Sequence, residues 1–328
     1  MERKTSKLFR NAVATTAVAC SVLFTCVQAS ADPLRVGVLL PGSRSDQGWM
    51  ESAYDGVLAA EATHGDNIKV QMIENVSNAD WDQALTILAQ NNDLVIGAAG
   101  QVQTSLMKVA KRFPKVNFSL IGGNKTGEEL ANFAGYDVKQ AEIAYVAGVA
   151  AGMLSKSGVI SYVGGLEVPP IVNAGIEFKN GAASVNPDIK FIANYTGDFD
   201  DVAKAKEATM AAIAQGADIH YHIMNLGLRG IEQAARENGT KIIGSYTDRC
   251  GTDDLYVGYS ITGIGFLLQF AVDEALNGSW KPGYKAFGLA MGPQASGMAV
   301  CNATPEMQNK IDDAEQAIRD GKIATLDG

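Results

Sequence analysis

The sequence predicts an α/β protein with two parallel β-sheets, each flanked by helices. Short apolar runs of four to eight residues alternate with helical patterns along most of the chain, and strands that alternate with helices form parallel sheets from βαβ units. Val, Ile and Leu dominate these runs, as expected for strands that are covered on both faces. About 297 residues follow a predicted signal peptide, which is enough for two domains with separate cores.

The first 31 residues have the pattern of a secretory signal peptide. A basic start, MERKTSKLFRN, is followed by an apolar stretch over residues 12–27 and by Ala29-Ser30-Ala31. Small residues two apart after an apolar core predict cleavage after Ala31, and the stretch is short for a membrane span. The alternative is a lipoprotein that is acylated at Cys20 or Cys26. Under either interpretation the protein is exported.

Charge and metal-ligand spacing exclude several classes of function. Removing residues 1–31 takes four basic residues and one acidic residue from totals of 27 and 36, which leaves a net charge of −12. This balance argues against nucleic acid or an anionic membrane surface as a partner. There is no paired CxxC motif, and His64, His220 and His222 show no ligand spacing with cysteine, so zinc is not expected. No other metal and no cofactor is predicted.

Two cysteines remain after cleavage at Ala31, namely Cys250 and Cys301. An exported protein folds in an oxidising compartment, so a disulfide between them is predicted. Two separate buried thiols are the alternative.

Eight segments are predicted to be strands. They are Leu34–Leu40, Ile68–Met72, Leu94–Gly97, Asn117–Ile121, Gly158–Val163, Ile189–Asn194, Asp218–His222 and Lys241–Ser245. The predicted helices are Asp82–Gln90, Leu106–Arg112, Lys139–Leu154, Pro170–Ala183, Val202–Gln215, Leu228–Asn238 and Ile261–Ala275, together with a helix that Trp49 opens.

These strands could close as one barrel or form two open sheets, and the connections favour two sheets. Phe133–Asp137 is interpreted as an extended connector, after which the strand–helix rhythm restarts at Gly158. A second connector follows Ser245, and the helix from Ile261 would return to the first lobe. Repeated crossings are typical of a hinged two-lobe receptor. The expected boundaries are 32–138 plus about 247–279 for the first lobe, and 139–246 plus about 280–328 for the second.

The stretch Arg35 to Met50 is a candidate binding segment. A buried strand breaks at Pro41-Gly42, a polar loop follows, and Trp49 opens a helix. Ligands of parallel α/β sheets bind beyond the carboxyl ends of strands, which makes Asp46 and Trp49 candidate contacts. The alternative is a plain turn in which Trp49 packs at the helix start.

Catalytic motifs are missing from the sequence. It contains no GxSxG, HExxH or GxxxxGK[ST] motif. His220 and His222 share one face of a strand and are interpreted as satisfied core or cleft residues, and Asp200-Asp201 as a helix N-cap. No enzyme activity is therefore expected. The alternative is a secreted enzyme that uses Asp46, His222 or Asp248 as acid or base.

Eight motifs follow one another between residues 34 and 280. They are SDQGWMESAYDG, VAKRFPKVNFSLIGG, AYVAGVAAGMLSKSGVISYVGG, NGAASVNPDIKF, YTGDFDD, AIAQGADI, GIEQAARENG and KIIGSYTD. In this order they resemble the basic membrane protein family of ABC-transporter solute receptors, which includes purine nucleoside receptors. VNPDIKF and AQGADI also occur loosely in sugar-binding relatives of the same fold, so the specificity of the resemblance lies in the combination.

The resemblance implies a type I periplasmic binding protein, in which two lobes, each a parallel sheet flanked by helices, are joined by three hinge crossings. In that family a heteroaromatic base is held between aromatic side chains from the two lobes. Trp49 and Asp46 correspond to the aromatic and acidic residues of the first family motif, and Phe199 to the second aromatic residue. Each aromatic face would add about 1–3 kcal/mol of stacking.

Three departures from the family pattern affect the expected ligand. The family usually has an acidic residue where this chain has Leu40 or Pro41, an Asp where it has Tyr246, and a Lys near Gly263. The last two contact ribose in the family. Tyr has one hydroxyl and cannot accept from both ribose hydroxyls as a carboxylate does. A free purine-type base or another flat heteroaromatic is therefore expected, rather than its nucleoside.

The predicted ligand-binding residues combine the strand-end positions with those that the resemblance implies. They are Asp46, Trp49, Gly100, Gln101, Phe199, Asn225, Tyr246 and Asp248. The resemblance also implies a monomeric periplasmic receptor that delivers its solute to an ABC permease in the inner membrane. A lipid-anchored form is the alternative for its location, and a sensory receptor of the same fold is the alternative for its function.

Overall fold

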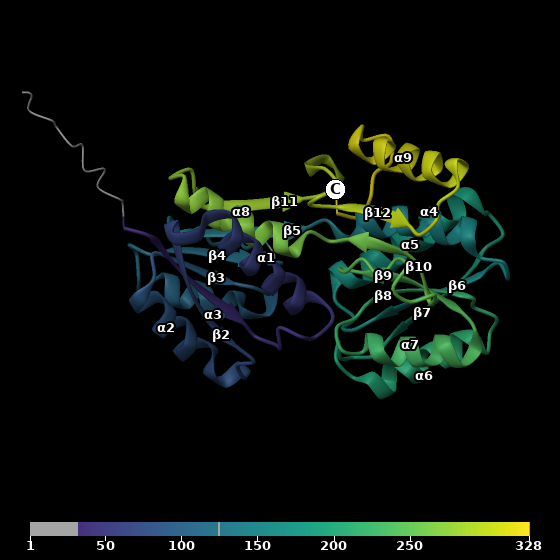
Figure 1. Ribbon diagram of the computed structural model, residues 1–328, viewed down its shortest axis with the longest axis horizontal. Helices are drawn as coiled ribbons and strands as arrows, with labels where there is room; N and C mark the ends of the chain where they lie inside the picture. Colours follow the sequence, from purple (N-terminus) through teal and green to yellow (C-terminus); the bar gives the residue numbers. More distant parts are fainter. Residues whose placement is uncertain (1–31, 124, 328) are drawn as a thin grey trace, which may run out of the picture. The chain divides into compact units, whose positions relative to one another are not determined.

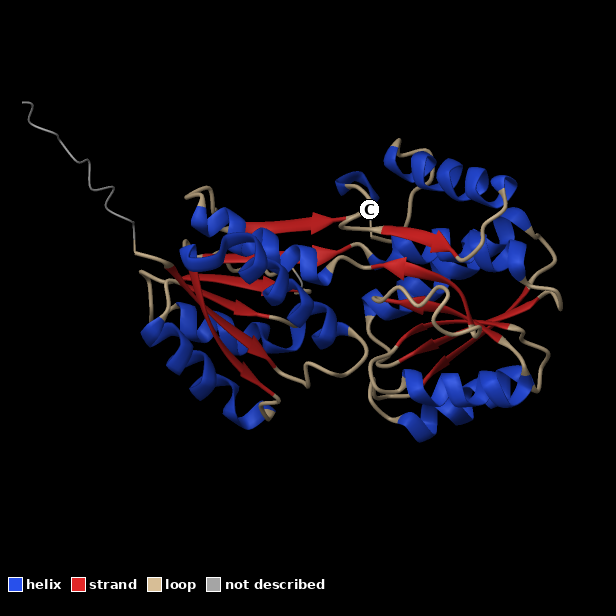
Figure 2. Cartoon of the chain, in the orientation of Figure 1, coloured by secondary structure: helices blue, strands red, loops and turns tan. Residues whose placement is uncertain are grey.

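The computed structural model describes residues 32–123 and 125–327 (Figure 1). The predicted signal peptide and both cysteines of the lipoprotein alternative lie outside the described residues. Residues Pro33 onward form one compact unit that contains two six-stranded sheets, drawn in red in Figure 2.

The first sheet has the strand order β11-β5-β4-β3-β1-β2, and every neighbouring pair in it is parallel. Its strands are β1 (Leu34–Leu40), β2 (Ile68–Glu74), β3 (Leu94–Gly97), β4 (Asn117–Ile121), β5 (Phe133–Val138) and β11 (Gly283–Phe287). The helices that cover it are α1 (Trp49–His64), α2 (Trp81–Asn91), α3 (Gln103–Ala110) and α8 (Ile264–Leu276). We call these elements the first lobe.

The strand β1 shows how the sequence places these layers. Val36, Val38 and Leu40 pack on the side of α1 and α8, whereas Leu39 packs on the side of α2 and α3. Successive side chains of a strand point to opposite faces, so a continuous apolar run is needed where helices cover both faces. All three side chains on the α1 side and Leu39 are fully buried.

The second sheet has the order β12-β10-β9-β8-β6-β7 and is parallel except for β12, which pairs antiparallel with β10. Its strands are β6 (Val159–Gly164), β7 (Lys190–Tyr195), β8 (Ile219–Ile223), β9 (Lys241–Ser245), β10 (Tyr256–Ile261) and β12 (Gly297–Val300). Its helices are α4 (Gln140–Leu154), α5 (Pro169–Val185), α6 (Val202–Ile213), α7 (Leu228–Asn238) and α9 (Pro305–Arg319). We call these elements the second lobe. Short 3₁₀ turns lie at Gly65–Asn67, Asn78–Asp80, Gly100–Val102 and Leu289–Met291.

Small residues let α4 and α5 pack closely in the second lobe. A Cβ atom added at Gly148 of α4 would lie 2.0 Å from the carbonyl oxygen of Phe178, and one at Gly181 of α5 would lie 1.8 Å from that of Tyr145. Both distances are far below van der Waals contact. The run of Ala and Gly in the α4 sequence therefore reflects backbone-to-backbone packing.

The two sheets and the repeated crossings confirm the predicted fold class. The chain passes between the sheets three times: after β5, between β10 and α8, and after β11. All eight predicted strands form, within one or two residues of their predicted ends. Phe133–Asp137, however, was interpreted as a connector and is strand β5, because it pairs in register with β4 and β11.

Strand pairing also corrects the later lobe boundaries. The segment 247–279 was assigned to the first lobe, but β10 within it pairs with β9 of the second sheet. The segment 280–328 was assigned to the second lobe, but β11 within it pairs with β5 of the first sheet. The physical reason is that both strands find their hydrogen-bonding partners in other strands of the sheet, which local hydrophobicity does not reveal.

The predicted disulfide forms between Cys250 and Cys301, whose Cα atoms lie 5.4 Å apart. Cys250 lies in the loop between β9 and β10, and Cys301 directly follows β12. The bond therefore joins two segments at the β10–β12 edge of the second lobe. Within the described part of the chain, we find no helix with the length and apolar character that a membrane crossing needs.

Candidate ligand-binding cavity

One cavity of about 490 Å³ is lined by residues from both lobes. In each sheet the strand order reverses beside one strand, which is β1 in the first sheet and β6 in the second, and ligands of α/β sheets bind at such switch points. The segments that follow β1 and β6 both reach this cavity. The lining residues are Trp49, Met50, Ala99, Gly100, Gln101, Gly122, Asp137, Gln140, Leu166, Val168, Pro169, Pro170, Ile171, Phe199, Ile223, Asn225 and Tyr246.

Trp49 provides an aromatic surface from the first lobe. It is the first residue of α1, and its indole Nε1 donates a hydrogen bond of 2.6 Å to the carbonyl oxygen of Ala98. Its ring lies against Gly122, where an added Cβ would come within 2.3 Å of the ring. The hydrogen bond and the glycine together hold the indole in one orientation, with part of its surface on the cavity.

Phe199 provides an aromatic surface from the second lobe. It lies in the loop between β7 and α6, and its ring packs on Gly165, where an added Cβ would lie 2.1 Å from the ring. Its carbonyl oxygen accepts hydrogen bonds from the backbone N–H groups of Asn225 and Gly227, at 3.0 and 3.1 Å. Trp49 and Phe199 thus line the same cavity from different lobes.

Tyr246 and Asn225 contribute polar atoms beside these rings. The Tyr246 ring meets the Trp49 ring edge-on, with centroids 6.3 Å apart. Its backbone has a φ of +71°, a left-handed conformation that non-glycine residues seldom adopt, and burial raises the pKa of its hydroxyl. Asn225 Oδ1 accepts a hydrogen bond of 3.2 Å from the Trp49 backbone N–H, so this side chain joins the two lobes beside the cavity.

Asp46 has a different place from the one predicted. Its carboxylate accepts hydrogen bonds from the backbone N–H groups of Gly48, Met50 and Glu51, at 2.8, 3.1 and 3.0 Å. It is 3% exposed and is not among the residues that line the cavity. Burial raises the pKa of this carboxyl, while the three N–H bonds act in the opposite direction. Asp46 therefore stabilises the start of α1, and so positions Trp49 indirectly.

Of the other predicted residues, Gly100 and Gln101 line the cavity, whereas Asp248 does not. The Asp248 carboxylate accepts a hydrogen bond of 2.8 Å from the backbone N–H of Cys250, which places it in the disulfide loop. Asp201, predicted as an N-cap, accepts from the backbone N–H of Lys204 at 2.9 Å and confirms that prediction.

Asp137 and Gln140 line the cavity and were not predicted. Asp137 lies in β5, and its two oxygens accept hydrogen bonds of 2.8 Å from the Tyr284 hydroxyl and from the Val138 backbone N–H. Gln140 opens α4, is 7% exposed, and its Oε1 has no hydrogen-bond partner. The strand-end rule that selected Trp49 would also have selected Asp137 if β5 had been recognised as a strand.

The two histidines of β8 are core residues, and neither lines the cavity. His220 lies between the hydroxyls of Ser161 and Thr240, at 2.7 and 2.9 Å, and burial lowers its pKa to about 4. His222 is equally buried, its ring nitrogens have no partner, and burial lowers its pKa to about 3. Across the described residues, no group of three or more His, Cys, Asp or Glu side chains could hold a metal ion.

The composition of the lining limits the ligand chemistry. Asp137 is the only charged side chain among the described lining residues, and neither Lys nor Arg reaches the cavity. A phosphate or carboxylate would find no cationic partner there and would lie near a carboxylate, which is unfavourable. Two aromatic rings, several aliphatic side chains and a few amide groups suit an uncharged, flat molecule.

Comparison with known proteins agrees with this geometry. Residues 34–292 match the Bmp family, which is described as ABC transporter substrate-binding protein PnrA-like. The chain is 28% identical over 304 residues to a purine-binding protein of Brucella abortus, covering 90% of this chain and 84% of that one. It is also 28% identical over 253 residues to the ABC transporter nucleoside-binding protein BmpA of Lactococcus lactis, covering 71% of each.

Solved structures share the fold at lower sequence identity. An ABC transporter solute-binding protein from Aeropyrum pernix superposes with a TM-score of 0.80 at 20% identity, covering 90% of this chain and 94% of that one. One from Conexibacter woesei gives a TM-score of 0.74 at 21% identity, covering 90% and 99%. The family match covers most of the chain, and we conclude that this protein belongs to the Bmp family of PnrA-like ABC transporter substrate-binding proteins.

Proposed function

We propose that this protein binds a purine-type base between Trp49 and Phe199, in preference to the corresponding ribonucleoside, and delivers it to an ABC permease. The observation that carries the proposal is that aromatic side chains from both lobes line a single cavity without cationic residues. Stacking on a base is worth about 1–3 kcal/mol for each aromatic residue. The relatives named as purine-binding and nucleoside-binding proteins support the same class of solute.

The preference for the free base rests on Tyr246 and Gly263. Tyr246 lines the cavity with one buried hydroxyl in place of a carboxylate. Gly263 has a φ of +39°, and an added Cβ would lie 2.2 Å from the carbonyl oxygen of Ala295, so a longer side chain at this position would require the backbone to move. A ribose would therefore enter a cavity that lacks two of its usual partners. An unmatched buried hydroxyl costs about 1–3 kcal/mol.

Isothermal titration with matched pairs tests this preference. Adenine is compared with adenosine, and guanine with guanosine, after unfolding and refolding the protein to remove any solute that co-purifies. We expect at least one base to bind tenfold more tightly than its nucleoside. Nucleosides that bind tenfold more tightly than their bases, a difference of about 1.4 kcal/mol, would contradict the role given to Tyr246.

The proposed site of action is the periplasm, after removal of residues 1–31. N-terminal sequencing of the exported protein should begin at Asp32. A lipid-modified Cys20 or Cys26 would instead support a membrane-anchored receptor. Mass spectrometry of the solute that co-purifies with the exported protein tests the proposed class of ligand directly, because a receptor returns its solute unchanged.

A further inference from the structure

We propose that Asp137 and Gln140 make the cavity selective for a base that presents adjacent N–H donors on one edge, which among the common purines is guanine. This inference rests on the proposed function, because it names which member of the purine class fits best. It is carried by the arrangement of hydrogen-bond acceptors on one part of the cavity lining.

The Asp137 carboxylate is oriented but not neutralised. The Tyr284 hydroxyl and the Val138 backbone N–H each donate to a different oxygen, and each carboxylate oxygen can accept two hydrogen bonds. One acceptor position on each oxygen is therefore available. No Lys or Arg lines the cavity and no salt bridge to Asp137 is found within the described residues, so donors from the ligand are the partners that would offset the burial of this charge.

Gln140 adds a second acceptor three residues along the chain. Its side chain is more than nine-tenths buried, it lines the cavity, and its Oε1 has no hydrogen-bond partner. An unsatisfied buried carbonyl oxygen is unfavourable, so a ligand that donates to it gains affinity. Asp137 and Gln140 together offer acceptors, and a complementary ligand edge must offer donors.

The common purines differ on this edge. Guanine carries N–H donors on N1 and on its 2-amino group. Hypoxanthine keeps the N1 donor but lacks the amino group, and adenine presents an acceptor at N1 beside its 6-amino donor. A carboxylate can accept from both guanine donors in a bidentate arrangement, which is stronger and more directional than a single hydrogen bond. Unmatched polar groups in such a site reject analogues strongly.

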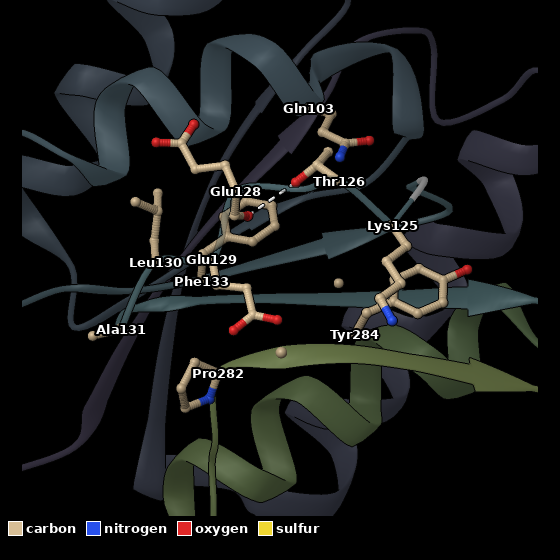
Figure 3. A pocket seen from close by; sticks show the side chains of 12 residues that line it. Gln103, Lys125, Thr126, Glu128, Glu129, Leu130, Ala131, Phe133, Pro282 and Tyr284 are labelled. Atoms are coloured by element: carbon tan, nitrogen blue, oxygen red, sulfur yellow. Dashed lines mark hydrogen bonds between the residues drawn. The ribbon is translucent and has the colours of Figure 1, made fainter.

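Tyr284 holds Asp137 from outside the cavity. Tyr284 also lines a second pocket of about 580 Å³ at the edge of the first lobe, together with Lys125, Phe133 and Pro282 (Figure 3). Most side chains that line this second pocket are exposed, and we assign it no ligand. Tyr284 is a positioning residue for Asp137, since its hydroxyl fixes one carboxylate oxygen and leaves the rest of the group for the ligand.

The test compares guanine, hypoxanthine and adenine by isothermal titration on the wild type and on Asp137→Asn. We expect the wild type to bind guanine at least tenfold more tightly than the other two bases. Asp137→Asn should lose this preference, with guanine weakened tenfold or more and adenine changed less than threefold, because the new amide can donate to adenine N1. Asp248→Asn is the matched control: it removes a carboxylate that does not line the cavity and should leave all three affinities unchanged.

Two further variants separate recognition from a general loss of structure. Gln140→Leu should reduce guanine affinity more than hypoxanthine affinity, and Tyr284→Phe should weaken guanine binding less than Asp137→Asn. Circular dichroism melting curves identify any variant that fails to fold. Equal affinities of the wild type for guanine and hypoxanthine, or an unchanged preference in a folded Asp137→Asn variant, would overturn the assignment while leaving purine binding intact.

A non-purine probe distinguishes the two proposals. Pterin carries the same donor edge as guanine on a different ring system. If no purine binds but pterin binds and Asp137→Asn abolishes it, the proposed function fails and the donor-edge assignment stands. If neither purines nor pterin bind, both are wrong.

Discussion

The two lobes share one strand order but differ inside. The buried sheet faces of the first lobe are mainly aliphatic. The second sheet contains a buried polar network in which His220 bridges Ser161 and Thr240, and Tyr221 contacts Ser260 at 3.2 Å. The second lobe also carries the disulfide. The same topology therefore accepts either a mainly aliphatic core or an apolar core that includes a buried polar network, provided that most buried donors and acceptors find partners.

The lobes also contribute differently to the cavity. The first lobe supplies the one charged residue among the described lining residues, Asp137. The second lobe supplies a larger apolar surface, which includes Leu166, Ile171 and Phe199, together with the amides of Gln140 and Asn225. An apolar wall supplies contact area with little directional preference, while a polar wall distinguishes one edge of a ligand from another. We therefore assign selectivity to Asp137 and Gln140, one from each lobe, and general affinity to the apolar surface of the second lobe.

Removing the disulfide should have the largest effect on stability. Cys250 and Cys301 are separated by 51 residues in the sequence, and closing a loop of this length is worth roughly 4 kcal/mol in the chain-entropy model. The double variant Cys250→Ser, Cys301→Ser should lose about that much free energy of unfolding in urea denaturation. Wild type treated with reductant is the matched control. An unchanged denaturation midpoint would show that the bond contributes nothing to the stability of the second lobe.

Acid should destabilise the second lobe through its buried histidines. The folded-state pKa values of His220 and His222, about 4 and about 3, lie below the unfolded value of about 6.5. The unfolded state therefore takes up protons first, and the stabilisation that is present above pH 6.5 is lost as pH falls toward 4. One pKa unit corresponds to 1.36 kcal/mol. The free energy of unfolding should therefore fall by an amount on the order of 3 kcal/mol for each histidine between pH 6.5 and pH 4.

Urea denaturation at pH 7, 6 and 5 measures how the free energy of unfolding changes with pH. His222→Leu should reduce this dependence on pH, because leucine has no group that binds a proton. Tyr221→Phe, on the same strand, is the control, since it removes a buried hydroxyl that does not titrate in this range. A wild-type stability that stays constant from pH 7 to pH 5 would contradict the prediction.

Replacing Trp49 should reduce affinity more than any other single change in the aromatic surfaces. Trp49→Ala should weaken binding of the best purine base by about 1–3 kcal/mol, because a stacking surface that two contacts hold in place is lost. Trp49→Phe keeps an aromatic face but loses the hydrogen bond to Ala98, so its loss should be smaller. A fall in melting temperature with unchanged affinity would mean that Trp49 only packs at the start of α1.

Phe199→Ala should have the smallest effect, near 1 kcal/mol at the lower end of the stacking range. Its ring is smaller than that of Trp49 and rests on Gly165 without a side-chain hydrogen bond. The loss should be similar for guanine, hypoxanthine and adenine, since the apolar surface of the second lobe is expected to add affinity without selecting an edge. A loss confined to one base would contradict this division between the apolar surface and the selective polar residues.

Local sequence patterns predicted the strands on one side of each sheet, including the edge strands β2 and β7, but missed those on the other side. Strands such as Val36–Leu40 and Ile242–Ser245 are buried on both faces and are recognised as apolar runs. The missed strands include β5, β11 and β12, whose sequences contain Gly, polar or exposed residues. These segments become strands because a neighbouring strand supplies hydrogen-bonding partners, and that neighbour is far away in the sequence.

The sequence by itself determined the βαβ order, the pairing of Cys250 with Cys301, and the position of Trp49 after a strand end, because these follow from local periodicity and from counting cysteines. Only the tertiary structure decided that Asp46 caps α1 while Asp137 faces the cavity. Both are acidic residues close to the end of a strand, so local pattern cannot distinguish them. Their roles differ because strand order places β11 beside β5 and so brings Tyr284 to Asp137, whereas the Asp46 carboxylate is occupied by three backbone N–H groups of its own loop and helix.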